Sequence, residues 1–256
     1  MIGLGIVIGL LIGLTGIGSG SLLTPALILL GGMPPATAVG TSLVFSFVTK
    51  LYGSWNFYRR GLVKREIVGW LLWGGLPGVL VGVVVIQRLR LRSPEVMNAF
   101  LLRAIGLALV LVSVIMLLRL LPLALRPAAV DRLLPLTERQ RRLLMVLAGF
   151  GVGVSVTLTS IGSGTAVIPA LVLLYRLDSG ALVGTSVFLG TILTGLAGIP
   201  HLSLGNIEWK ALAALLCGSV PGLWLASHVH GRFPRHIPEG IIAAVLMALG
   251  IRIFAF

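Results

Sequence analysis

Two long stretches of this chain carry no charged side chain. Residues Met1–Thr49 and Leu143–Tyr175 contain no Asp, Glu, Lys or Arg. Soluble domains have about 25% charged residues, whereas this chain of 256 residues has 11%, together with 57% hydrophobic residues. A water-exposed surface cannot be built from such stretches. Because long apolar runs cross lipid as helices, the sequence predicts an all-α polytopic membrane protein.

A glycine-rich motif occurs once in each uncharged stretch. Residues Thr15–Gly20 read T-G-I-G-S-G, and Thr159–Gly164 repeat them as T-S-I-G-S-G at an offset of 144 residues. Between Thr15–Leu30 and Thr159–Leu174, 10 of 16 positions are identical, including a later P-A-L. Duplication explains this identity far better than chance does. An internal repeat of this kind sets the architecture of the whole chain.

The repeat continues in register beyond the opening motif. The further matches are V-G-T-S at 39–42 and 183–186, Gly61 and Gly205, Pro-Gly at 77–78 and 221–222, Pro-Glu at 94–95 and 238–239, and Gly106 and Gly250. We therefore predict one membrane domain in three parts. Its first repeat covers residues 1–121, a charged linker covers residues 122–140, and its second repeat covers residues 141–256.

Each repeat is predicted to contain one broken segment and three whole transmembrane helices. A spanning helix needs about 20 apolar residues. The segments that fit are roughly 35–52, 66–87, 96–120, 180–199, 207–228 and 237–256. Two further runs, Ile2–Gly31 and Leu143–Tyr175, have 30 and 33 residues. Straight helices of that length would measure about 45–50 Å, against a hydrocarbon core of about 30 Å. We expect a break at the glycine motif, since glycine is a poor helix former.

The break allows two topologies. If each broken segment crosses the membrane with a kink, the halves are parallel, and the loops carry 12 Lys and Arg on the cytoplasmic side against six outside. If each broken segment folds back as a re-entrant hairpin, the halves are inverted, and the count is 13 against five. Both satisfy the excess of basic residues in cytoplasmic loops, which also accounts for the net charge of +13 without a nucleic-acid partner. Segment length favours the hairpin, because each half of a broken run is expected to be too short to span alone.

The two glycine breaks form the predicted binding site. Paired helix breaks at corresponding positions of two repeats point to the binding site of a transporter. A half-helix that begins near Ser19 or Ser163 would offer free N–H groups and a positive dipole end to an anion. The predicted substrate-binding residues are Gly18, Ser19, Gly20, Ser21, Gly162, Ser163, Gly164, Thr165, Thr41, Ser42, Thr185, Ser186 and Lys50. The alternative reading is that small residues allow close helix packing in lipid.

Two features outside the breaks bear on mechanism. Lys50 lies inside a predicted helix, where a charge is costly enough to indicate function, although its long stem also allows it to snorkel to the interface. All seven acidic residues lie in loops or at segment edges, whereas ion-coupled carriers often use a buried carboxylate. We therefore expect uniport of an anion driven outward by the inside-negative potential, or coupling through a group such as His201. We place His201 at the membrane interface.

The motifs resemble those of the TauE/SafE sulfite exporter family. The resemblance rests on the core G-x-G-S-G-x₄-P-x-L, the V-G-T-S that follows, the R-R-G-L-V at Arg59–Val63 and the Pro-Gly pairs, and it covers nearly the whole chain. It implies a multi-pass inner-membrane transporter, usually an exporter, of small sulfur-containing anions such as sulfite, thiosulfate, sulfoacetate or related organosulfonates. The second copy departs from this pattern at Leu204–Ile207, which lacks the paired arginines.

Other functional classes fit the sequence less well. An intramembrane serine protease would need a serine in a G-x-S-G setting with a histidine on another helix, but Ile17 and Ile161 occupy the first-glycine position. We expect no enzymatic activity, no cofactor and no metal site. The expected partners are the lipid bilayer and a small anion, and the sequence leaves open a homodimer. An anion channel stays as the alternative to a carrier, since helix dipoles and basic residues serve channels too.

Overall fold

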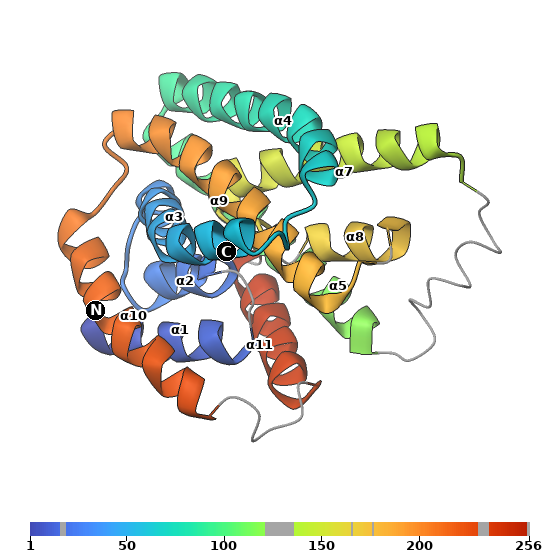
Figure 1. The fold of residues 1–256 in the computed structure, drawn as a ribbon. Coiled ribbons are helices and arrows are strands. Elements are labelled where there is room, and N and C mark those ends of the chain that lie inside the picture. Colours follow the sequence, from blue (N-terminus) through green and yellow to red (C-terminus); the bar gives the residue numbers. More distant parts are fainter. Residues whose placement is uncertain (16–18, 121–135, 165, 176, 230–235, 255–256) are drawn as a thin grey trace.

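The computed structural model describes residues 1–15, 19–120, 136–164, 166–175, 177–229 and 236–254. Within these ranges, every regular element is a helix (Figure 1). The helices are α1 (Ile2–Thr15), α2 (Ser19–Leu29), α3 (Pro35–Arg59), α4 (Arg65–Arg92), α5 (Pro94–Leu120), α7 (Glu138–Thr159), α8 (Val167–Tyr175), α9 (Ser179–Ser203), α10 (Trp209–Val229) and α11 (His236–Phe254). The prediction of an all-helical fold is thereby confirmed for these residues.

Among the described residues, five helices are long and apolar enough to cross a membrane. They are Arg65–Arg92, Pro94–Leu118, Glu138–Thr159, Ser179–Ser203 and Trp209–Ala226. The predicted span at 35–52 forms the 25-residue helix α3, which falls outside this group because it is more polar. Several of its hydroxyl side chains are buried, among them Thr41, Ser42 and Ser46. A helix enclosed by other helices does not need an apolar surface toward lipid.

Helix α7 is longer than the sequence predicted. It has 22 residues and begins at Glu138, within the segment predicted as a linker. Thr137 caps it with a reciprocal bond to Gln140, which satisfies two backbone donors at the helix start. At about 1.5 Å per residue, α7 is about 33 Å long, so the expectation that each half of a broken run is too short to span was wrong for this half.

Two parallel helix pairs pack through glycines. In the pair of α1 and α10, a Cβ built on Gly5 would lie 2.6 Å from the carbonyl oxygen of Leu215, and one on Gly9 would lie 2.6 Å from that of Ser219. In the pair of α4 and α7, a Cβ built on Gly74 would lie 1.8 Å from the carbonyl oxygen of Val146, and one on Gly78 would lie 2.3 Å from that of Phe150. Backbones this close leave no room for larger residues, as is typical of helix packing in lipid.

Helices α3 and α9 run antiparallel in the middle of the molecule. Figure 1 shows them between the two glycine-packed pairs. Near one end, a Cβ on Gly40 would lie 3.2 Å from the Cβ of His201, and near the other the Nζ atom of Lys50 would lie 3.5 Å from a Cβ on Gly190. Residues later in α3 therefore contact residues earlier in α9, which shows that the two helices are antiparallel. Both helices also begin and end at positions 144 residues apart.

Helices α5 and α11 also run antiparallel. A Cβ on Gly106 would lie 2.9 Å from the backbone nitrogen of Phe254. Further along α5, the hydroxyl of Ser113 donates to the carbonyl of Ala243 at 2.6 Å. Residues later in α5 therefore contact residues earlier in α11.

The chain folds back on itself between α7 and α8. Figure 1 shows α7 and α8 running in opposite directions. A guanidinium nitrogen of Arg141, in the first turn of α7, donates to the carbonyl of Leu174, in the last turn of α8, at 2.7 Å. In the first half of the chain, the Cε atom of Met1 lies 3.1 Å from the Cβ position of Gly31. The start of α1 therefore lies beside the end of α2, as the start of α7 lies beside the end of α8.

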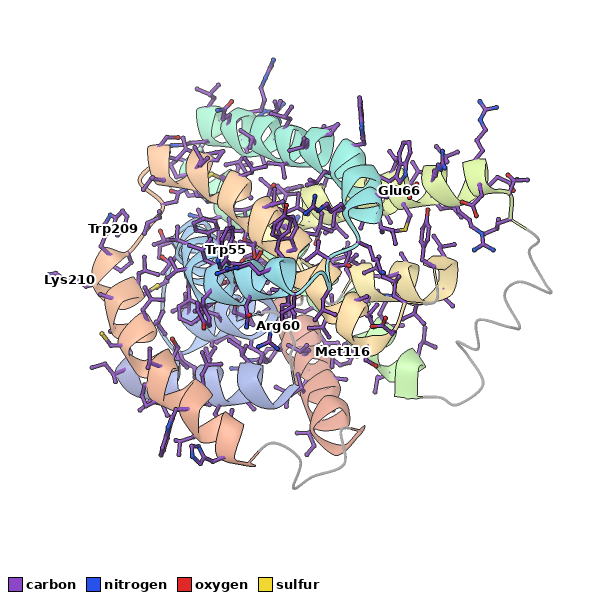
Figure 2. All side chains as sticks on the ribbon, in the orientation of Figure 1. Trp55, Arg60, Glu66, Met116, Trp209 and Lys210 are labelled. Atoms are coloured by element: carbon purple, nitrogen blue, oxygen red, sulfur yellow. The ribbon has the colours of Figure 1, made fainter. Side chains whose placement is uncertain are left out.

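The outer surface carries large apolar and aromatic side chains. Trp55, Trp73 and Trp209 are exposed, and Figure 2 shows Trp209 and Lys210 at the outer edge, where α10 begins. Among the described residues, the one ion pair joins Arg142 to Glu66 at 3.7 Å between the starts of α7 and α4 (Figure 2). This combination of exposed apolar side chains and peripheral charges suits a surface that faces lipid with its charges near the headgroups.

Candidate functional site

The start of α2 is buried against α3. Ser19 is 1% exposed, and its hydroxyl shares a hydrogen bond with the hydroxyl of Ser46, which is fully buried on α3. Ser21 is also buried in the first turn of α2. The first N–H groups of a helix have no partner within the helix. The first predicted break therefore holds a helix N-terminus inside the protein. Gly18, predicted to belong to it, lies outside the described residues.

The second break lies between the end of α7 and the start of α8. Ser160 ends α7 in the left-handed conformation, with a φ of 63°, and Gly162 follows with a φ of 99°, which suits a residue without a Cβ. The backbone N–H of Ile161 donates to the hydroxyl of Thr159 at 3.1 Å, and the carbonyl of Ile161 accepts from Ser155 at 3.0 Å. Side chains thus satisfy the non-helical backbone, as buried polar groups require. Gly164 lies in the following turn, and Thr165 lies outside the described residues.

The two breaks are in direct contact. A Cβ built on Gly20 would lie 1.8 Å from the carbonyl oxygen of Ser160. The hydroxyl of Ser160 donates to that of Ser42 on α3 at 3.1 Å, and both side chains are fully buried. The start of α2, the end of α7 and the middle of α3 therefore meet inside the protein. We call this meeting point the tip junction, defined by Ser19, Gly20, Ser42, Ser46, Ser160 and Ser163.

Lys50 brings a positive charge to the tip junction. Its ammonium group donates to the hydroxyl of Ser163 at 2.7 Å, and Ser163 is 2% exposed. Among the described residues, no carboxylate forms an ion pair with Lys50. The five acidic residues whose side chains are described are all exposed. A partly buried cation without a carboxylate partner favours the binding of an anion.

The predicted residues Thr41 and Thr185 hold loops instead of reaching the tip junction. The hydroxyl of Thr41 accepts from the backbone N–H of Glu208, just before α10, at 3.0 Å. The hydroxyl of Thr185 accepts from the backbone N–H of Lys64, just before α4, at 3.1 Å. Each bond gives a partner to a backbone donor near the start of a helix. Ser186 donates to the carbonyl of Val183 in its own helix at 3.0 Å.

The sequence prediction missed three residues that lie in the tip junction or pack against it. Ser46 lies four residues from both Ser42 and Lys50, so a helical spacing of i, i+4, i+8 along α3 would have found it. Gly190 lies four residues after Ser186 and packs against Ser163, but a single glycine in an apolar helix gives no such signal. Ser160 lies within the motif, but it was not among the predicted binding residues, and it faces α3 because α7 ends at Thr159.

His201, predicted to lie at the membrane interface, is enclosed by protein near the end of α9, and its depth in the membrane stays a prediction. His201 is fully buried, and its Nε2 atom lies 3.1 Å from the carbonyl oxygen of Thr157 on α7. It lies near the end of α9, where it packs beside Gly40 of α3. The histidine is enclosed because α7 and α3 both cover the last turns of α9. It therefore belongs to the interior, away from Lys50.

Comparisons with known proteins agree on one family. The family model described as sulfite exporter TauE/SafE matches residues 1–253. The probable membrane transporter protein YjnA of Bacillus subtilis (strain 168) is 34% identical over 254 residues, which covers 98% of this chain and 97% of that protein. The probable membrane transporter protein YunE of the same organism is 24% identical over 256 residues, which covers 95% of this chain and 90% of that protein. No solved structure gives a significant match. The chain is therefore a multi-pass membrane protein that belongs to the sulfite exporter TauE/SafE family of transporters.

Proposed function

We propose that this protein carries a small sulfur-containing anion across the inner membrane and holds it at the tip junction. The observation that carries the proposal is the hydrogen bond from Lys50 to Ser163, made by a cation that has no carboxylate partner among the described residues. Sulfite, thiosulfate and sulfonates offer several acceptor oxygens to such donors. The N-terminus of α2 adds a positive dipole end nearby.

We further propose that the two repeats are inverted and that α1–α2 and α7–α8 are re-entrant hairpins. Equivalent helices of the two halves run in opposite directions, as α3 does against α9 and α5 against α11. Within each half, the bond from Arg141 to Leu174 and the contact of Met1 with Gly31 support a hairpin over a kinked span. In inverted-repeat transporters, the binding site lies near the bilayer midplane at the interface between repeats.

Labelling of two equivalent positions tests this topology. Arg59 and Ser203 are exposed, end their helices and lie 144 residues apart. Each is changed to cysteine in a Cys217→Ser background, which removes the only native cysteine. With a membrane-impermeant maleimide, we expect one position to label in intact cells and the other only after permeabilisation. Labelling of both from the same side would contradict inverted repeats and would support the parallel arrangement.

The closed tip junction favours a carrier over a channel. Ser19, Ser42, Ser160 and Ser163 are at most 2% exposed, and Gly20 lies against the backbone of Ser160. An anion can reach these serine hydroxyls only when the contacts open, and a carrier opens its site to one side at a time. Both breaks come from one chain, so a homodimer is not required for binding. We propose export, with the anion driven outward by the inside-negative potential.

Transport in proteoliposomes tests the proposed function. The purified protein is assayed with sulfite, thiosulfate, sulfoacetate, taurine and sulfate, with protein-free vesicles as the control. We expect saturable uptake of at least one sulfur anion, faster when the potential is positive on the receiving side. We expect no stoichiometric proton flux. Unitary currents that rise linearly with voltage would contradict a carrier, and absence of flux and binding for every anion would contradict the proposal as a whole.

A further inference from the structure

The two breaks are not equivalent in their surroundings. The offset of 144 residues relates Ser19 to Ser163, Ser46 to Gly190 and Lys50 to Thr194. At the first break, the hydroxyl of Ser19 is bonded to the hydroxyl of Ser46. At the second break, the equivalent of Ser46 is a glycine, and the hydroxyl of Ser163 is bonded to the ammonium of Lys50.

Gly190 allows the second break to come close to α9. A Cβ on Gly190 would lie 2.3 Å from the carbonyl oxygen of Ser163 and 3.5 Å from the Nζ atom of Lys50. The first distance is far shorter than a carbon–oxygen contact in a folded protein, so a side chain at this position would push Ser163 away. Gly190 therefore fixes the position of the Ser163 hydroxyl within reach of the ammonium.

The positive charge is present at one break only. Thr194, which takes the place of Lys50 in the second repeat, donates to the carbonyl of Gly190 at 2.7 Å within its own helix. It therefore offers its hydroxyl proton to backbone and not to an anion. The first break thus has two serine hydroxyls bonded to each other, whereas the second has an ammonium group without a carboxylate partner among the described residues.

We propose that the transporter binds one anion per chain, at the second break, between Lys50 and Ser163, and that Gly190 is the positioning residue that makes this break the binding one. The proposal rests on the anion transport proposed above and narrows its site from two breaks to one. The bound anion accepts from the ammonium and the serine hydroxyl and lies beside the main chain of α9. The first break serves as the closing surface, through the contact of Gly20 with Ser160.

Calorimetric titration with sulfite tests the stoichiometry on the unmodified protein. We expect one anion per chain. Two anions per chain with similar affinities would overturn the single site while leaving anion transport intact. If neither sulfite nor another sulfur anion binds and none is transported, the proposed function fails as well, so the two failures are distinguishable.

Two alanine variants of α9 test the role of Gly190. Gly190→Ala should weaken sulfite binding at least tenfold, because the added Cβ displaces Ser163. Gly198→Ala is the matched control, since its Cβ would meet its nearest neighbour at 3.8 Å, an ordinary contact. It should bind sulfite as the unmodified protein does. Equal binding by both variants, with melting temperatures that show both are folded, would contradict the role of Gly190. If Gly190→Ala does not fold, the number of sulfite anions bound per chain by the unmodified protein decides whether there is a single site.

Discussion

Replacing Lys50 by methionine should remove most of the affinity for sulfite. Methionine keeps an unbranched apolar stem but removes the ammonium group that bonds Ser163. A hydrogen bond to a charged group contributes about 1.5–3 kcal/mol, so the apparent affinity should fall roughly 10- to 100-fold. Transport measured at low sulfite concentration should fall to the same extent. The comparison is made by uptake into proteoliposomes over a range of sulfite concentrations.

The stability of the same variant separates binding from structure. Because a partly buried charge without a carboxylate partner is costly, Lys50→Met should melt at the same temperature as the unmodified protein or higher. Lys64→Met is the control, since the side chain of Lys64 is exposed before α4, and it should transport normally. Unchanged sulfite affinity in Lys50→Met would show that the lysine serves the fold or the interface and not the substrate.

A methyl group at Gly20 should prevent the tip junction from closing. Its Cβ would lie 1.8 Å from the carbonyl oxygen of Ser160, and a backbone atom cannot move aside as a side chain does. Overpacking of this kind costs typically about 1–3 kcal/mol, so the melting temperature of Gly20→Ala should fall by roughly 2–12 °C. Transport should be strongly reduced, because the state in which the tip junction is closed is then disfavoured.

A second glycine provides the matched control for Gly20. Gly53 lies in α3, where an added Cβ would meet no atom within 4 Å. Alanine is a better helix former than glycine by up to about 1 kcal/mol, so Gly53→Ala should be as stable as the unmodified protein or more stable. Equal melting temperatures and transport rates for the Gly20 and Gly53 variants would mean that the two breaks do not touch in the working protein.

The lengths of the apolar runs predicted most of the helices, because the thickness of the bilayer confines a spanning helix to a narrow range of lengths. The all-helical membrane fold and the positions of α4, α5, α9 and α10 follow from apolar runs of spanning length. The length of α7 was predicted less well, because its first five residues, Glu138–Arg142, are polar. An apolar window excludes such residues, whereas the capping box at Thr137 begins the helix before them.

The direction of the repeats could not be read from the sequence. Both topologies satisfied the bias of basic residues, because few loop charges change sides between them. The information lies in contacts between distant residues, such as Gly106 with Phe254, and no local pattern encodes which of two apolar helices packs against another. The inverted arrangement proposed here rests on those contacts.

The candidate site was predicted in part. The glycine motif pointed to Ser19, Gly20 and Ser163, and the cost of a charge in lipid pointed to Lys50, but which of these residues meet depends on the packing of α3 against both breaks. The V-G-T-S motif has two neighbouring hydroxyls with different contacts. The side chain of Thr41 contacts the loop before α10, whereas that of Ser42 lies in the tip junction, because adjacent residues of a helix point about 100° apart.

Locating a bound anion directly is the most decisive measurement. A structure of the protein with 2-bromoethanesulfonate would reveal the ligand through the anomalous scattering of bromine. The account predicts sulfonate oxygens within about 3.2 Å of both the Lys50 ammonium and the Ser163 hydroxyl, with the bond between these two groups opened. An anion bound elsewhere, with Lys50 still bonded to Ser163 and the tip junction unchanged, would contradict it.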